Sequence, residues 1–449
     1  MSLDQLVKGE AEQPMLCLPH QCEFLSDTWL ERARLFLEQA IDRSPQTLPA
    51  FSFAKRFVDA PPHLGCKENV AQWSVKFDGK TLLVDRELAP NPEFYVEGVY
   101  QAGLFMAQVV GAQVQDSRAE AVAEMKHLFG AEALHSTGRI SDPGVAGIAA
   151  QLHDHMARMT VENPDLCHRA QALGVDKHIR EMETQGYTVI ENAISPEFAD
   201  KVREATLRAV KSHDGFQLQW MLYHGLEFER LVQNAPVMTL IDASLGRGAG
   251  IASISAIVRG PGPGTIPIHT DYSMVPEPYP EFAMTGVGVW ALEDWTVASG
   301  PTWIVPGSHL ERRAPRKGEG LDHGIPIEMP KGSVVYFTHG VWHWQGDRTE
   351  AGERTTIHSH FNRGILRGLE PKRVDVQMMH RNAPRLGEML GEDDWFDKLD
   401  AHGRDYLRAG HMSRLQAFTD QRKQALLAAC TDQAPIQNEA KSLRELQEE

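Results

Sequence analysis

Two histidines and one aspartate have the residue types and the spacing of a three-ligand metal site. His269 and Asp271 are two residues apart and follow the β-rich run 251–258, and residues so spaced in an extended segment point to one face. His343 follows a second apolar run, 334–337, far along the chain. Two imidazoles and a carboxylate on one face of Fe(II) leave positions open for a cosubstrate and O2. The sequence therefore predicts a facial metal triad of His269, Asp271 and His343.

Arg354 adds a permanent positive charge shortly after His343. Oxidases with such a triad commonly use 2-oxoglutarate, which chelates iron through its keto acid and leaves a second carboxylate to be held. A planar guanidinium binds a carboxylate in a two-pronged way. The run 354–358 is β-like, and we expect it to pair beside the strand that precedes His343, with a turn at 347–352. Arg354 is thus the candidate anchor for the cosubstrate.

Three other histidines compete with His343 for the third ligand position. His339 and His343 have the i, i+4 spacing of a helical metal motif, but Gly340 and the preceding β run disfavour a helix. His358 and His360 share a strand face, so they could bind the metal or line the pocket. The spacing in sequence between His343 and Arg354 favours His343 over the other histidines as the third ligand.

This region resembles the phytanoyl-CoA dioxygenase family of Fe(II)/2-oxoglutarate oxygenases. The match rests on five segments that occur in one order: His269-Thr270-Asp271, Val289–Trp295, Ser299–His309, Lys331–Phe337 and His343 with the step to Arg354. A helix–strand–helix opening extends the resemblance to about residues 177–391.

The resemblance implies that His269, Asp271 and His343 bind Fe(II) and that Arg354 binds 2-oxoglutarate. It also implies that Trp290 is an aromatic residue near the cosubstrate. Related halogenases replace the carboxylate ligand by a small residue, so Asp271 favours hydroxylation or a related oxidative outcome instead.

The first part of the chain has a different order of elements. A capped helix is expected from Ser26-Asp27, followed by a hairpin of 72–77 and 80–84 around Asp78-Gly79. Further helices are expected at 93–110, 119–129 and 144–159. Segments 73–80 and 134–140 weakly resemble sterol-carrier-protein-2-like domains, which implies an apolar tunnel for lipids or acyl chains. The alternative is an accessory or dimerisation domain.

The expected fold is α+β with two domains. Residues 1–160 form a small α+β accessory domain and 161–176 a connector. Residues 177–433 form a double-stranded β-helix (jelly-roll, cupin-like) with flanking and C-terminal helices, and 434–449 a flexible tail.

The composition of the chain argues against some classes of binding partner. The net charge of −16 argues against nucleic acid and anionic membranes, which select basic surfaces. No apolar run approaches the ~20 residues that span a bilayer, and residues 1–13 carry no signal-peptide core. The five cysteines lack a C-x-x-C pair and are typical of reduced thiols in the cytoplasm. We expect a cytoplasmic protein with a small-molecule substrate and a possible homo-oligomer through the N-terminal domain.

The predicted function is a non-haem Fe(II)- and 2-oxoglutarate-dependent dioxygenase that uses O2 to hydroxylate a small organic molecule and releases succinate and CO2. One alternative is a 2-oxoglutarate-independent metal oxidase or epoxidase with the same triad. Another is a non-catalytic lipid or acyl carrier that uses the N-terminal domain.

Overall fold

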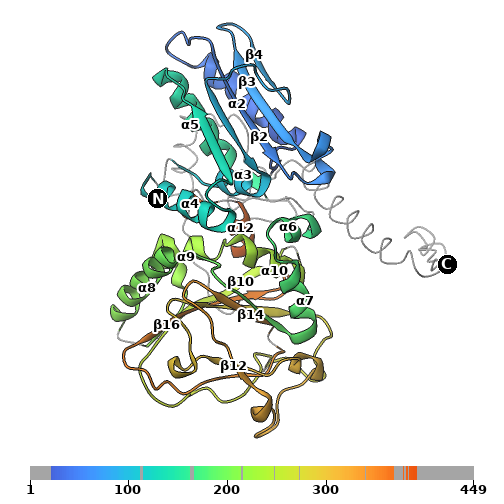
Figure 1. Ribbon diagram of the computed structural model, residues 1–449, viewed down its shortest axis with the longest axis vertical. Coiled ribbons are helices and arrows are strands. Elements are labelled where there is room, and N and C mark those ends of the chain that lie inside the picture. The colour runs from blue at the N-terminus through green and yellow to red at the C-terminus, as the bar shows by residue number, and fades with distance from the viewer. Residues whose placement is uncertain are drawn as a thin grey trace, which may run out of the picture.

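The computed structural model describes residues 22–111, 115–161, 166–213, 216–246, 248–272, 274–338, 340–368, 378, 381–382 and 384–391. The N-terminal elements lie at the top of Figure 1 and the C-terminal elements below them, with α12 (Pro384–Leu390) between the two. The expected tail and most of the expected C-terminal helical region lie outside the described residues.

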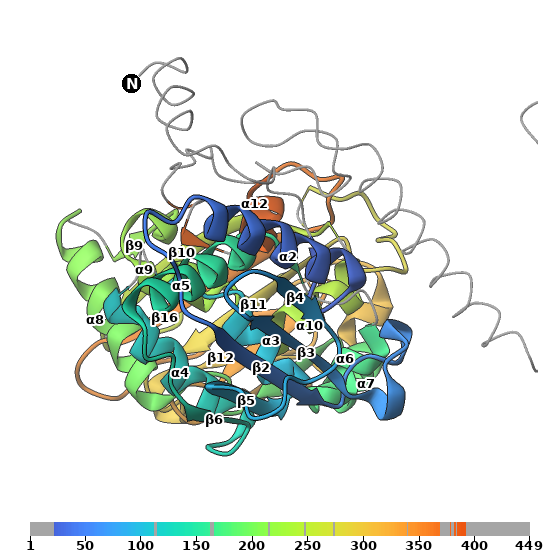
Figure 2. The same cartoon turned by 90° about the horizontal axis from the view of Figure 1, so that it is seen from above.

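A five-stranded sheet and three helices form the core of the N-terminal part. The strand order is β4-β3-β2-β5-β6. The bounds are β2 Phe51–Val58, β3 Ala71–Phe77, β4 Leu82–Asp85, β5 Phe94–Val99 and β6 Leu134–Gly138. Helices α2 (Asp27–Asp42), α3 (Tyr100–Ala107) and α5 (Pro143–Ala157) share one apolar cluster with the sheet, and α2 and α5 lie side by side (Figure 2).

The predicted capped helix and hairpin are confirmed. Ser26 Oγ accepts a hydrogen bond from the Trp29 amide at 3.2 Å, which satisfies a free N–H at the start of α2. Strands β3 and β4 pair antiparallel, with Val75 opposite Val84. The helices expected at 119–129 and 144–159 are α4 (Gln115–Phe129) and α5.

The helix predicted over 93–110 is wrong in its first half. Residues 94–99 form β5, which runs parallel to β2 and antiparallel to β6, and only α3 is helical. Phe94, Tyr95 and Val96 favour a strand, and pairing on both sides satisfies their backbone groups. Strand β2, which lies between β3 and β5 in the sheet, was not predicted.

The C-terminal part contains the predicted helix–strand–helix, which follows helix α6 (Leu166–Ala172) in the chain. Helix α7 (Asp176–Gln185) precedes β8 (Tyr187–Ile190), and α8 (Pro196–Lys211) starts at Ser195, whose Oγ accepts from the Phe198 amide at 3.1 Å. Helices α9 (Leu226–Leu231) and α10 (Ala235–Leu245) also belong to this part.

Two facing sheets follow. The larger has the antiparallel order β8-β14-β11-β16-β10-β9, and the smaller has the order β13-β12-β15. Their bounds are β9 Gln217–Leu218, β10 Gly250–Arg259, β11 Thr285–Ala291, β12 Thr302–Ile304, β13 Ile325–Pro326, β14 Val334–Thr338, β15 His343–Gln345 and β16 Arg354–Asn362.

The larger sheet has a different partner on each face. One face packs against helices α8, α9 and α10 in the largest apolar cluster. The other face joins residues of the smaller sheet in a second cluster, which contains Val289, Ile304 and Phe337. This two-sheet arrangement confirms the predicted jelly roll.

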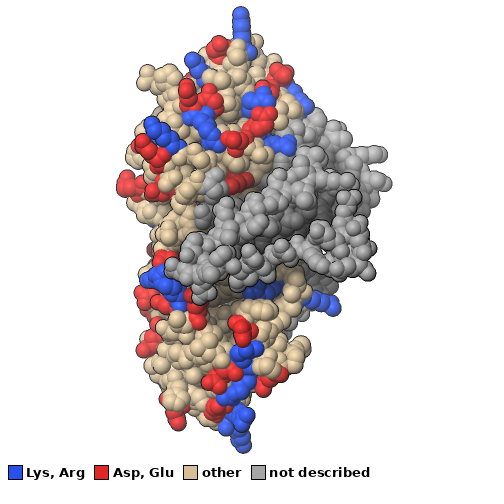
Figure 3. Space-filling model, turned by 90° about the vertical axis from the view of Figure 1, so that its right-hand side faces the viewer, with Lys and Arg blue, Asp and Glu red and all other residues tan. Residues whose placement is uncertain are grey.

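No helix among the described residues is long and apolar enough to cross a membrane. On the face shown in Figure 3, acidic and basic side chains alternate over both parts of the molecule. Among the described residues visible on that face, there is no broad basic patch of the kind that binds nucleic acid.

Candidate metal centre

The structure brings His269, Asp271 and His343 together. One ligand atom from each residue lies within 4.8 Å of the other two. The Nε2 atoms of His269 and His343 lie 3.4 Å and 3.8 Å from Asp271 Oδ1. Metal–ligand bonds of ~2.0–2.2 Å place ligand atoms around one ion at such separations. The three side chains can therefore hold a single ion.

Backbone contacts orient both imidazoles toward that position. His269 Nδ1 lies 2.8 Å from the Pro267 carbonyl oxygen, and His343 Nδ1 lies 3.0 Å from that of Val341. A carbonyl oxygen only accepts hydrogen bonds, so Nδ1 of each ring donates and Nε2 keeps its lone pair. Each histidine thus presents the tautomer that a metal ligand requires.

The surroundings of the two histidines differ. Burial, and then the neighbouring His269, lower the pKa of His343 against the attraction of Asp271. Burial alone would also lower the pKa of His269, but hydrogen bonding and attraction from Asp271 raise it. The His269 side chain is 34% exposed and that of His343 only 10%, so solvent reaches the cluster from the His269 side.

Of the competing histidines, His358 lies near the triad but outside it. Burial first, and then His360 and Arg354, lower the pKa of His358 to about 3, while Asp271 opposes them. His358 therefore adds a neutral imidazole near both the triad and Arg354. His339 lies outside the described residues.

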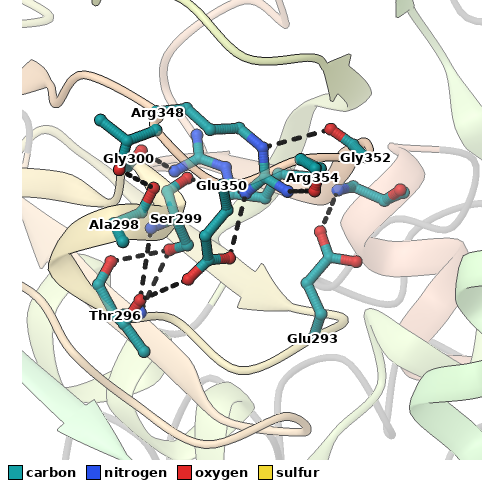
Figure 4. Close-up of polar contacts among 12 residues, drawn as sticks. Glu293, Thr296, Ala298, Ser299, Gly300, Arg348, Glu350, Gly352 and Arg354 are labelled. Carbon is teal, nitrogen blue, oxygen red and sulfur yellow. Dashed lines mark hydrogen bonds and ion pairs between the residues drawn. The ribbon is translucent and has the colours of Figure 1, made fainter.

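Arg354 is buried, at 4% exposure, and has one side of its guanidinium fixed (Figure 4). Its Nη1 donates to the Gly300 carbonyl, and its guanidinium carbon lies 5.0 Å from the centre of the Trp295 ring. Its buried Nε has no hydrogen-bond partner among the described residues. A buried donor left unpaired is costly, so this atom fits an anionic ligand.

Neighbouring charges make the surroundings of Arg354 electropositive. Burial, and then Arg259 and Arg348, lower the pKa of Arg354 to about 10, and Glu293 opposes them. The residue remains charged at neutral pH. Glu293 is engaged elsewhere, because it accepts from the Thr355 amide at 2.5 Å and from Arg203 Nε at 3.0 Å.

Arg348 and Gly300 support Arg354, and neither was predicted from the sequence motifs. Arg348 donates to the carbonyls of Ser299 (3.1 Å) and Ala351 (3.1 Å), which fixes the loop carrying Gly300 (Figure 4). Gly300 has φ +70°, and a Cβ there would lie 2.9 Å from the Arg348 backbone nitrogen. The Ser299-Gly300 pair was the only signal for this contact in the sequence.

The hairpin predicted between His343 and Arg354 is wrong. His343 begins β15 in the smaller sheet, whereas Arg354 begins β16 in the larger sheet, between β11 and β10. The segment between them therefore crosses from one sheet to the other, which is how the jelly roll brings the two residues to one interior.

Trp290 does not join the other predicted site residues. It is opposite Ile357 in the β11–β16 register and belongs to the helix-facing cluster, and its Nε1 donates to Ser359 Oγ at 3.2 Å. Val289, its neighbour, is opposite His358 and faces the jelly-roll interior.

The interior also carries a polar stripe that was not predicted. In the β10–β16 register, Arg259 is opposite Arg354, Ser255 is opposite His358, and Ser253 is opposite His360. Directly opposed residues share a face. Polar side chains therefore line the interior on two adjacent strands.

The fold is a cupin-like jelly roll that brings two histidines and an aspartate within reach of one ion. Residues 182–355 match the family model described as phytanoyl-CoA dioxygenase (PhyH).

The chain is similar over part of its length to curated proteins. It is 25% identical over 171 residues to "Dioxygenase af480" of Aspergillus fumigatus, which covers 36% of this chain and 53% of the relative. It is 28% identical over 79 residues to the uncharacterized protein Rv1501 of Mycobacterium tuberculosis, which covers 18% of this chain and 29% of that protein. The chain thus spans about half of the first relative and less of the second.

Solved structures of HygX from Streptomyces hygroscopicus are also similar. The form with nickel and 2-oxoglutarate bound is 14% identical with a TM-score of 0.37, and the form with iron bound is 13% identical with a TM-score of 0.36. Each match covers 43% of this chain and 88% of HygX.

Proposed function

We propose that this chain is a non-haem Fe(II)- and 2-oxoglutarate-dependent dioxygenase that hydroxylates a small organic molecule. The observation that carries the proposal is the convergence of His269, Asp271 and His343 on one point inside a jelly roll. The family of residues 182–355 supports it.

The donor set fits the implied groups. Two neutral imidazoles and a carboxylate suit Fe(II), and the free Nε of Arg354 suits the distal carboxylate of 2-oxoglutarate. When bound, Fe(II) supplies the oxidative chemistry, in which O2 gives one oxygen atom to the substrate and one to the succinate formed with CO2.

The protein's own residues supply position and environment. His269, Asp271 and His343 would hold the metal on one face, and Arg354, fixed by Gly300 and Trp295, would hold the cosubstrate. Burial of His343 and Arg354 limits water on their side of the site, whereas the His269 side stays open to solvent.

The polar stripe supports a substrate with polar substituents. Ser255 offers a hydroxyl, and His358 a neutral imidazole, on the interior face that also carries Arg354. These groups would orient the substrate by hydrogen bonds. We therefore propose a small polar molecule in preference to a plain hydrocarbon.

We also propose the division of the chain into 1–160, the connector 161–176 and the catalytic region 177–433. Two separate apolar clusters support two units, one formed by residues up to Met159 and a larger one that already includes Ala170 and Val175 of the connector. A cytoplasmic location and a homo-oligomer through the N-terminal part belong to the same proposal.

Anaerobic titration tests the cofactor assignment. Adding Fe(II) and then 2-oxoglutarate should produce a visible charge-transfer band. Arg354→Ala should weaken 2-oxoglutarate binding about ten- to hundredfold, the value of a lost charge-assisted hydrogen bond. The exposed Arg316 provides the control, Arg316→Ala, which should leave the titration unchanged. An unchanged titration in Arg354→Ala would remove Arg354 from this role.

Product analysis separates the alternatives. Succinate formed in step with O2 consumption supports the proposal, whereas substrate oxidation without succinate identifies a 2-oxoglutarate-independent metal oxidase. A protein that binds no iron and co-purifies with lipid would instead be a carrier.

A further inference from the structure

A lysine interrupts the apolar face of the central N-terminal strand. Along β2, Phe51, Phe53 and Phe57 belong to the core under the helices, and Lys55 lies on the same face because strand residues alternate. Its neighbours in register are Trp73 on β3 and Val96 on β5. A single charged residue therefore lies among aromatic and aliphatic side chains.

Lys55 has no ion-pair partner among the described residues. Its favourable contact there is with Trp73, whose ring centre lies 5.8 Å from the ammonium nitrogen. A cation–π contact contributes about 0.5–2 kcal/mol. Lys55 is half-buried, so its ammonium loses part of its water and gains no carboxylate partner among the described residues in exchange.

A cavity lies directly beside Lys55. Its volume is about 230 Å³, and its wall includes Trp29, Phe53, Trp73 and Met156. An apolar cavity of roughly 150 Å³ accepts benzene. This cavity has room for a ring with a short chain, or for a comparable aliphatic body.

The charges around the cavity are mainly positive. Arg118 from α4 and His153 from α5 line it with Lys55. Burial, and then Lys55 and Arg118, lower the pKa of His153 to about 4, so this imidazole is neutral at pH 7. The nearby carboxylate, Asp154, accepts from the Gly111 amide at 2.7 Å. Burial, and then Arg118, lower the pKa of Lys55 to about 8.

We propose that this cavity binds an amphiphilic organic anion, with its carboxylate on Lys55 and Arg118 and its apolar body against Trp73, Trp29 and Phe53. The ligand is a medium-sized carboxylic acid with an aromatic or aliphatic body. This site is separate from the metal centre and does not depend on the proposed oxygenase function.

Calorimetry on the full chain tests the proposal with 4-phenylbutyrate, decanoate and the uncharged 4-phenylbutanol. The wild type should bind at least one acid about tenfold or more tightly than the alcohol, because only the acid gains a charge-assisted hydrogen bond. Lys55→Met should abolish that preference. Lys76→Met, at the exposed residue of β3, should retain it.

Three further readouts distinguish this site from the metal centre and from a lysine with a purely structural role. Acid binding near pH 8 should take up protons, because an anion raises the pKa of Lys55, and Lys55→Met should show none. Binding should persist in His269→Ala; its loss there would locate the acid at the metal centre. Lys55→Met should also melt at or above the wild-type temperature. No acid binding at millimolar concentration, equal affinity for acid and alcohol, or unchanged preference in Lys55→Met would each overturn the proposal.

Discussion

His269 and His343 exchange both of their backbone hydrogen bonds, with each amide nitrogen 3.0 Å from the other's carbonyl oxygen. This antiparallel bridge fixes two distant segments in register and brings the ring centres to 4.2 Å. Backbone pairing therefore fixes the relative positions of the two histidines in the proposed metal site. Its geometry should survive loss of a ligand side chain.

Asp271→Ala should abolish iron binding while leaving the fold intact, because the bridge does not use that side chain. Metal analysis should show less than about a tenth of the wild-type iron. Added Fe(II) at about 100 times Kd should stabilise the wild type by about 2.7 kcal/mol and leave the variant unchanged. His323→Ala, at an exposed histidine, serves as the control. Full iron content in Asp271→Ala would contradict the triad.

Gly300→Ala should weaken 2-oxoglutarate binding without loss of iron. An added Cβ would lie 2.9 Å from Arg348 and displace the carbonyl that holds Arg354. We expect KM for 2-oxoglutarate to rise about tenfold or more. Gly318→Ala is the matched control, because Gly318 also has a positive φ (+79°) but no atom within 4 Å of the added Cβ. Equal effects of the two substitutions would attribute the change to backbone strain alone.

Asp242→Ala should strongly destabilise the C-terminal part. Asp242 accepts from Arg169 and Arg385 at 2.6 Å each, and all three side chains are buried. Removing the carboxylate leaves two buried guanidinium groups without it, which costs about 3–5 kcal/mol. Urea unfolding should show this loss. Asp200→Ala, at the exposed Lys331–Asp200 pair, should change stability by less than about 1 kcal/mol.

His155→Phe should reduce the sensitivity of the N-terminal part to acid. Burial, and then Arg158 and Arg32, lower the pKa of His155 to about 4 from its ordinary 6.5. Between these values the unfolded chain binds more protons, so the wild type loses stability as the pH falls, by up to about 3 kcal/mol from this group. Phenylalanine preserves the stacking on Phe36. Urea unfolding at about pH 5 and pH 7 should show a smaller difference in the variant.

The exposed His135 gives the control for that comparison. His135→Phe on β6 should leave the acid sensitivity at its wild-type value. If His155→Phe loses as much stability on acidification as the wild type, the destabilising protonation occurs elsewhere.

The triad and the jelly roll could be read from the sequence because their signals are local. H-x-D, a distant histidine after an apolar run, and short β patterns require no knowledge of packing. The side of the sheet to which Trp290 points could not be predicted from the sequence, because its neighbours Val289 and Ala291 are also apolar. Only its pairing opposite Ile357 places it among the helices.

Elements that depend on pairing were also missed. Residues 94–99 carry a pattern compatible with either a helix or a strand, and the neighbours β2 and β6 decide the outcome. The hairpin expected from His343 to Arg354 failed for a similar reason, because nearness in sequence did not mean membership of one sheet. Lys55, in contrast, carried a local signal as a lysine spaced evenly between phenylalanines.

Even-numbered and odd-numbered residues of strand β16 lie on opposite faces of the sheet and have different roles. Even positions, with His358 and His360, face the interior, and odd positions, with Ile357 and Phe361, belong to the helix-facing core. Substitutions at the even positions after Arg354 should therefore alter which substrate is accepted, because the helix-facing core is not touched. Related domains could therefore acquire a different substrate through amino-acid substitutions at every second residue of this one strand.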